Sequence, residues 1–244
     1  MTTLVRIAIT LALSVFLTSC GMDIKIGEFG SGVKGNGIVT KDSRPVNEDF
    51  TVISASEGLE VIVTQAAIFE ITVEADENII ALIGTDINNN VLKIHAIENI
   101  GNATKKVYVS LPNISEIKSA SGANLTAKNT IKSERLTIDS SSGSLVNLKV
   151  VTDNLDIDAS SGANIKIIGE TGNATIDASS GSNVSANELA TKFCDAEASS
   201  GANVAINVSK TLHADASSGG NISYSGKAQV DTKKNVSGSV TFNN

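Results

Sequence analysis

A short phrase built around Ser-Ser-Gly returns along the second half of the chain at a nearly constant interval. Its glycines are separated by steps of 21, 19, 19, 20 and 18 residues, and a looser copy follows at Gly238. The regular positions are Gly122, Gly143, Gly162, Gly181, Gly201 and Gly219. Such spacing is typical of a solenoid, in which each repeat packs on its neighbours and the corners absorb small differences in length.

Apolar residues recur at fixed distances from these glycines. The position five residues before the glycine is aliphatic, as at Ile138, Ile157 and Ile176, and so is the position three residues after it, as at Val146 and Ile165. Each repeat therefore holds two short strands with period-two alternation, too small to bury their apolar faces alone. Stacking of consecutive repeats predicts an all-β fold, a right-handed parallel β-helix with coils of about 19 residues. A propeller blade would need about twice this period.

The corner residues are expected to be structural. Glycine can supply a positive φ at the bend, and small side chains would let stacked corners approach closely. Two residues after the glycine an asparagine recurs, and stacked asparagines would form a ladder of amide hydrogen bonds. The ladder positions are Asn124, Asn164, Asn183, Asn203 and Asn221, and Leu145 interrupts them.

An acidic residue stands four positions before the glycine in five successive repeats. These residues are Asp139, Asp158, Asp177, Glu197 and Asp215. Stacked carboxylates about 5 Å apart repel one another by about 1 kcal/mol per neighbouring pair in water. A stripe of Ca²⁺ ions could neutralise them, since Ca²⁺ takes several carboxylate oxygens. The alternative is a solvated face screened by water and salt, and the sequence favours it over calcium.

Catalysis is not expected, although a polysaccharide-binding or polysaccharide-cleaving β-helix that uses the acidic stripe is an alternative. Carboxylate pairs of the kind that glycoside cleavage uses are plentiful on the acidic stripe. A polysaccharide lyase would also need a strong base or cation near bound calcium, but Arg44 and Arg135 lie outside the regular acidic face. The repeated serines have no histidine at a recurring position. His95 and His213 have no partner at metal-ligand spacing, and Cys194 falls in an inward apolar column, so we expect a buried, inert thiol.

The N-terminal segment predicts export and lipid attachment. Residues 1–19 contain Arg6 and an apolar run from Ile7 to Leu17, and they end in a lipobox-like Leu-Thr-Ser before Cys20, the expected lipidation site. Residues 20–48 are rich in glycine and predict a tether. Residues 49–112 predict an N-terminal β region continuous with the solenoid, with one helical turn possible around residues 78–84, and residues 113–244 form the β-helical repeats.

Composition limits the partners. The net charge of −7 and the 3 % aromatic content, without tryptophan, argue against nucleic acid. We expect membrane contact through the lipid anchor and a protein or glycan partner at the surface.

The lipobox, the glycine-rich lead, the segment RPVNEDFTVISASEGLEVIVTQ and the serial Ser-Gly-Ala-Asn copies together resemble a bacterial envelope family, the putative auto-transporter adhesin, head GIN domain. The resemblance runs from about Pro45 to Val240, with Leu145 and the last copy, NVSGSV, as departures. It implies a β-helix-like body, an adhesive role in the cell envelope and no catalytic residues. We therefore expect a lipid-anchored, non-catalytic adhesin or binding scaffold. We expect it on the outer membrane, because Gly21 follows Cys20 where, in some bacteria, an aspartate favours retention in the inner membrane. A purely structural envelope spacer is the other alternative.

Overall fold

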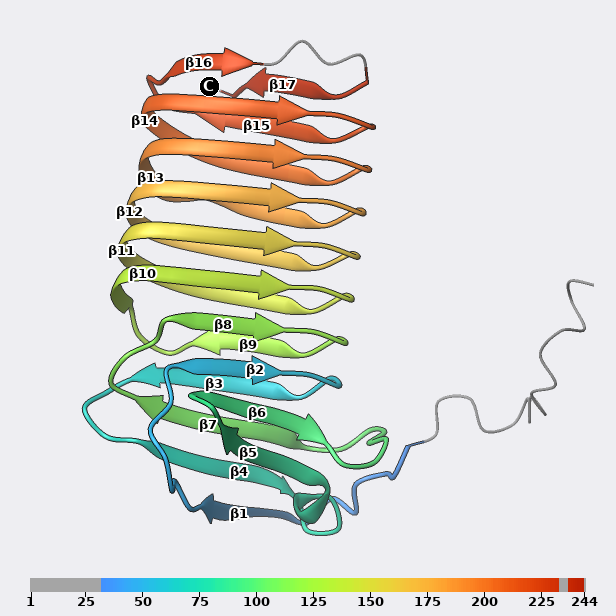
Figure 1. The fold of residues 1–244 in the computed structure, drawn as a ribbon. Coiled ribbons are helices and arrows are strands. Elements are labelled where there is room, and N and C mark those ends of the chain that lie inside the picture. The colour runs from blue at the N-terminus through green and yellow to red at the C-terminus, as the bar shows by residue number, and fades with distance from the viewer. Residues whose placement is uncertain (1–31, 233–236, 244) are drawn as a thin grey trace, which may run out of the picture. The chain divides into compact units, whose positions relative to one another are not determined.

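The protein is a stack of parallel β-coils. The computed structural model describes residues 32–232 and 237–243, and within these ranges it contains seventeen strands, one 3-10 helix and no α-helix (Figure 1). The predicted signal peptide and Cys20 lie outside the described residues. No helix within the described ranges is long and apolar enough to cross a membrane.

The repeat region forms a β-solenoid of about six turns with a spacing of about 19 residues, which confirms the predicted fold class. Its long strands run from one Ser-Ser-Gly corner through a bend to the next, so each strand contributes to both sides of the coil (Figure 1). The strands are β8 (Glu116–Ser119), β9 (Asn124–Ala127), β10 (Ile131–Ser140), β11 (Leu145–Ala159), β12 (Asn164–Ala178), β13 (Asn183–Ala198), β14 (Asn203–Ala216), β15 (Asn221–Ser225), β16 (Gln229–Thr232) and β17 (Ser239–Phe242).

The core consists of the aliphatic columns seen in the sequence. Ile138 pairs with Ile157 and Ile157 with Ile176 in parallel register, and all three are buried. On the other side of the coil, in the first halves of the same strands, Val146 pairs with Ile165 in the same way. Side chains about 19 positions apart therefore touch in one continuous interior, and this stacking stabilises coils that could not bury their apolar faces alone.

The Ser-Ser-Gly corners are tight turns with two left-handed residues. Ser161 has φ 51° and Gly162 has φ 75°, and the Ala163 N–H donates to the Ser160 carbonyl at 3.0 Å. This geometry is that of a type I′ turn. Positive φ at the serine, repeated at the other five corners, was not expected. A Cβ built on Gly162 would meet nothing within 4 Å. Glycine is therefore required there for its positive φ, as expected, and not for the close approach of stacked corners that was also expected.

Hydrogen bonds link the corners of successive coils. The Gly143 N–H donates to the Ser161 carbonyl of the next coil, and the Ser160 N–H donates to the Ser140 carbonyl of the preceding coil, both at 3.0 Å. Backbone N–H and carbonyl groups of the corners are thus paired with those of neighbouring coils, as they are in the strands.

The bends opposite these corners are irregular. Ile206 and Asn207 are adjacent in β14, yet they pair with Ala186 and Ala190 of β13, so β13 accommodates three more residues than its neighbour at this point. A smaller register shift separates Lys166 from Ile168 in β12. Coil length therefore varies at the bends while the sheets on either side keep their register.

The N-terminal region completes the stack in an order that differs from chain order. Its elements are β1 (Val39–Arg44), β2 (Val52–Ala55), β3 (Glu60–Gln65), β4 (Glu70–Asp76), the 3-10 helix η1 (Ile80–Leu82), β5 (Ile83–Asn88), β6 (Val91–Ala96) and β7 (Lys105–Leu111). Strands β2 and β3 pair in parallel with β8 and β9 on one side and with β6 and β7 on the other. An early coil is therefore inserted between two later ones.

Antiparallel strands pack at this end of the stack. β4 pairs with β7 and with β1, and β5 forms a hairpin with β6 through Asn89 and Asn90, both with positive φ. The helical turn around residues 78–84 is the 3-10 helix η1, which leads directly into β5, a strand that was not predicted.

Part of the expected tether belongs to the folded body. Within residues 20–48, the segment Val39–Arg44 is strand β1. The buried Asp76 carboxylate accepts the Gly37 N–H at 2.9 Å and the Thr104 N–H at 2.7 Å. These bonds tie the glycine-rich lead to the β-sheet, so the folded body begins earlier than the boundary placed at residue 49.

Candidate functional site

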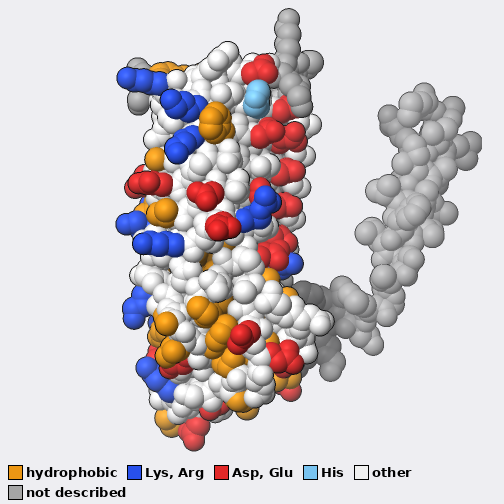
Figure 2. All heavy atoms as spheres, turned by 60° about the vertical axis from the view of Figure 1, so that its left-hand side comes forward, with side chains coloured by type: hydrophobic (Ala, Val, Ile, Leu, Met, Phe, Trp, Pro, Cys, Tyr) orange, Lys and Arg blue, Asp and Glu red, His pale blue; other side chains and the backbone are white. Residues whose placement is uncertain are grey.

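The outer face formed by the second halves of β10 to β14 carries the acidic column. The register places the acids on successive coils, next to Lys118 of β8 at one end; they are Asp139, Asp158, Asp177, Glu197 and Asp215. Figure 2 shows acidic side chains in a row along the solenoid, with Lys and Arg side chains along the other margin of the same view.

Mutual repulsion and partial burial act on the middle of this column. The pKa of the Asp158 carboxyl lies above its usual value of 3.8, first because of desolvation and then because of the negative charges of Asp139 and Asp177. The electrostatic cost anticipated from the sequence thus falls on Asp158.

The acidic column does not form a chelating cluster. In residues 32–232 and 237–243 no group of three or more His, Cys, Asp or Glu is arranged to hold a metal ion. A column on a flat face spreads its carboxylates along the stack, whereas Ca²⁺ needs oxygens that converge on one point. Calcium binding at this stripe stays the less favoured alternative to a solvated face.

The asparagine column lies on the opposite sheet, and its members share one register. The Asn221 amide donates to Asn203 Oδ1 at 3.2 Å, while the Asn164 amide donates to the Gly162 carbonyl of its own corner at 3.1 Å. Corner bonds of this second kind also occur at Asn203 and Asn221. These amides therefore brace the turns, and Asn221 also bonds to Asn203 of the preceding coil.

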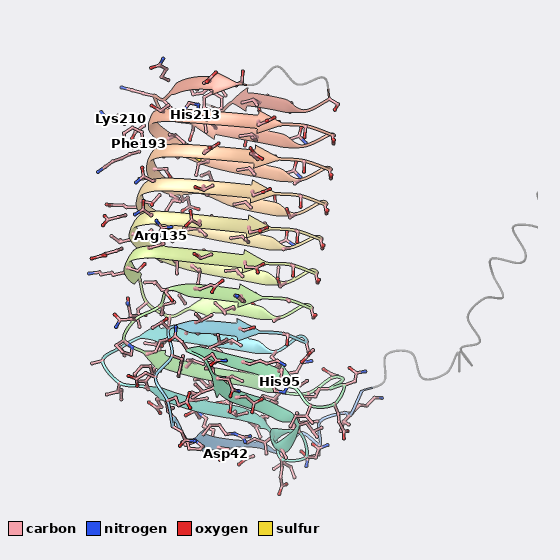
Figure 3. All side chains as sticks on the ribbon, in the orientation of Figure 1. Asp42, His95, Arg135, Phe193, Lys210 and His213 are labelled. Atoms are coloured by element: carbon pink, nitrogen blue, oxygen red, sulfur yellow. The ribbon has the colours of Figure 1, made fainter. Side chains whose placement is uncertain are left out.

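The two histidines lie in different parts of the fold (Figure 3). His95 on β6 packs against Gly84, where a Cβ would come within 2.4 Å of its ring, and its Nδ1 is 3.6 Å from Asp86. His213 on β14 is exposed, and its Nδ1 lies 3.4 Å from Asp231. Beside the corners, Ser140 and Ser144 share a hydrogen bond, and Ser144 and Ser182 donate to backbone carbonyls.

Cys194 lies in the core, as predicted. It pairs in register with Ala174 and Leu212, and its side chain is buried. Burial, with a smaller contribution from Asp195, raises the pKa of its thiol to about 12. The thiol is therefore protonated at neutral pH and is a poor nucleophile.

The surface of the described residues has several open hollows. One hollow of about 440 Å³ follows the bends, where Thr152, Thr171 and Thr191 form a buried column. A second, of about 550 Å³, lies in the N-terminal region beside Arg44, Glu48 and Asp86. Besides the threonines, the first hollow is lined by Asp153, Glu170, Lys192 and Ser209.

A third hollow of about 360 Å³ contains a residue that the sequence reasoning did not single out, Phe193. Phe193 stands eight residues before Gly201, in a column that is Ile114 in the first repeat and polar in the other repeats, at Arg135, Asn154, Asn173 and Thr211. Extending the alignment by one more column would have shown this exception.

Comparison with known proteins agrees with the architecture. The family model described as putative auto-transporter adhesin, head GIN domain, matches residues 49–228. No curated protein matches the chain.

Solved structures share the fold. A putative adhesin from Parabacteroides merdae ATCC 43184 has a TM-score of 0.72 at 22 % identity, and the match covers 87 % of this chain and 99 % of that chain. A putative adhesin from Bacteroides fragilis NCTC 9343 has a TM-score of 0.77 at 18 % identity, with 86 % and 99 % covered. A structure named as a putative lipid binding protein from Parabacteroides distasonis ATCC 8503 has a TM-score of 0.68 at 16 % identity, with 87 % and 99 % covered.

Proposed function

Because the chain belongs to the putative auto-transporter adhesin, head GIN domain family, we propose that it is a non-catalytic adhesin held in the cell envelope by a lipid on Cys20. The family and the related structures support an adhesin-like surface or envelope protein. The lipid, the absence of catalysis and an outer-membrane location are our own additions.

The observation that carries the adhesive role is the regular outer surface. Successive coils present equivalent side chains in register, as in the acidic column and the asparagine column on the two sheets. Many weak, equally spaced contacts to a repetitive partner would add up to strong attachment through effective concentration. A single deep pocket would instead suit a small substrate.

Adhesion is tested with cells that express the full chain. We expect them to adhere to immobilised mucin, matrix proteins or polysaccharides better than cells with an empty vector. If the expressing cells adhered no better than the empty-vector cells to any of the three coatings, the result would contradict the adhesive role and favour a structural spacer. Release of reducing ends or unsaturated products from the same polysaccharides would favour the polysaccharide-cleaving alternative.

The lipid anchor has its own test. Cys20→Ser should abolish incorporation of a fatty-acid analogue and shift the protein to the aqueous phase in detergent partitioning. Cys194→Ala is the matched control, since Cys194 is the other cysteine of the chain and is buried. Retained labelling in Cys20→Ser would refute the anchor.

A further inference from the structure

Phe193 is an apolar exception on a polar face. Its side chain is 49 % exposed, and it lies in register with Asn173 on one side and Thr211 on the other. The remaining members of the column are Arg135, Asn154 and Gln229. An exposed ring is unfavourable in water, and the fold does not require one here because its neighbours fill the same position with polar residues.

The ring also lacks an aromatic or cationic partner. Among the aromatic residues that the structure describes, Phe50 pairs with Phe69 at 5.2 Å, Tyr224 pairs with Phe242 at 5.4 Å, and Lys41 lies 5.7 Å above Tyr108. Phe193 is the remaining one, and no ring contact is found for it. Its face is therefore available for a ligand.

Polar side chains surround the ring in a fixed arrangement. The hollow of about 360 Å³ is lined by Phe193 together with Asn173, Thr175, Asp195, Thr211 and His213. These residues come from three consecutive strands, β12 to β14, so the backbone ladder sets their spacing. Figure 3 labels Phe193 on β13 and Lys210 and His213 on the next long strand, β14.

Charges of both signs flank the ring. Lys192 precedes Phe193, and Lys210 precedes its partner Thr211; both lysines are exposed. Asp195 and Asp231 flank His213 in register on the other side. The acids on one side would repel an anionic ligand, and the lysines on the other would repel a cationic ligand. Together, the side chains around the ring can both donate and accept hydrogen bonds.

We propose that this hollow is a saccharide-binding subsite, in which the apolar C–H face of a neutral hexose stacks on Phe193. The Asn173 amide N–H groups already donate to Asn154 Oδ1 and to the Asp153 carbonyl. The sugar hydroxyls therefore donate to the carboxylate of Asp195 and to Asn173 Oδ1, and accept from the Thr211 hydroxyl. A pyranose ring has one apolar face and a rim of hydroxyls, which matches an aromatic ring on a flat sheet with polar side chains around it. The inference rests on the adhesive role proposed above and names the ligand class of one site.

The test uses saturation-transfer NMR on the full-length protein in a detergent that contains no sugar. The probes are neutral oligosaccharides of glucose, galactose and mannose, with a sialylated oligosaccharide and a lysine-rich peptide for comparison. We expect transfer to the ring C–H protons of at least one neutral probe, with affinity in the millimolar range. Phe193→Ala should weaken that binding by about tenfold, and Phe193→Tyr should retain it.

Leu145→Ala is the matched control. Leu145 is 46 % exposed on the opposite sheet, so its truncation removes similar apolar surface without touching the hollow. The proposal is overturned if no neutral probe binds, if Phe193→Ala binds as the wild type does, or if only the sialylated probe or the peptide binds. Adherent cells whose adherence is unchanged by Phe193→Ala would overturn this subsite while leaving the adhesive role standing.

Discussion

Replacing Ile157 by alanine tests the stacked core directly. Ile157 is 3 % exposed and lies between Ile138 and Ile176. The change removes three carbon groups, which at about 0.8 kcal/mol each lose about 2.4 kcal/mol of transfer free energy. The neighbours are held by the ladders above and below and can collapse only partly, so the residual cavity raises the expected loss to about 3–4 kcal/mol.

The adjacent residue is the control. Asp158 points outward from the same strand, so Asp158→Ala should change the free energy of unfolding by no more than about 0.5 kcal/mol, or should increase it. Urea unfolding followed by far-ultraviolet circular dichroism suits a chain without tryptophan. Because single coils of a repeat array can unfold separately, amide hydrogen exchange should be measured alongside the urea unfolding. Equal stabilities of the two variants would refute the assignment of inward and outward columns.

Three further predictions follow from the same geometry. The raised pKa of Asp158 means that the folded state binds its proton more tightly than the unfolded state does, so stability should fall as pH rises from below 3.8 through the raised value. Asp158→Asn should flatten that part of the pH–Tm curve and raise Tm at neutral pH. The rise should exceed that for Asp139→Asn, because Asp139 also neighbours Lys118. If Asp158→Asn instead lowered Tm, and only in the presence of calcium, the result would favour the cation stripe. Gly162→Ala should cost about 1 kcal/mol, the left-handed penalty less the entropy gained, whereas Ser161→Gly should stay within about 0.5 kcal/mol; calorimetry showing no loss for Gly162→Ala would contradict the turn assignment. Leu145→Asn should raise the urea midpoint slightly by adding amide bonds at the gap, and a marked drop would show that Leu145 contributes to packing.

Much of the solenoid could be predicted because its physics is local and repeated. The two apolar columns and the glycine spacing determine which residues face inward, and the observed pairing of Ile138, Ile157 and Ile176 follows from them. The positive φ of the corner serines was missed because serine has no strong preference for that conformation; the repeated turn imposes it.

The N-terminal order could not be predicted in the same way. Strand β2 alternates in a manner that any parallel neighbour would satisfy, so nothing in its pattern indicates that β6 and β8 flank it. The contribution of β1 depends on the buried carboxylate of Asp76, which reads in the sequence as an ordinary strand-end acid. The Phe193 hollow was missed because it depends on three coils lying side by side.

The register shift between β13 and β14 suggests how such a protein could change during evolution. Val184 and Cys194 of β13 still align with Val204 and Leu212 of β14, although β13 holds two more residues between them. Three extra residues lie between Ala186 and Ala190, and one extra residue of β14 lies opposite the segment between Thr191 and Phe193. Insertions at this edge could diversify the exposed loops from one variant to the next without refolding the barrel-like shaft. The same edge is a natural place to graft a foreign peptide for display.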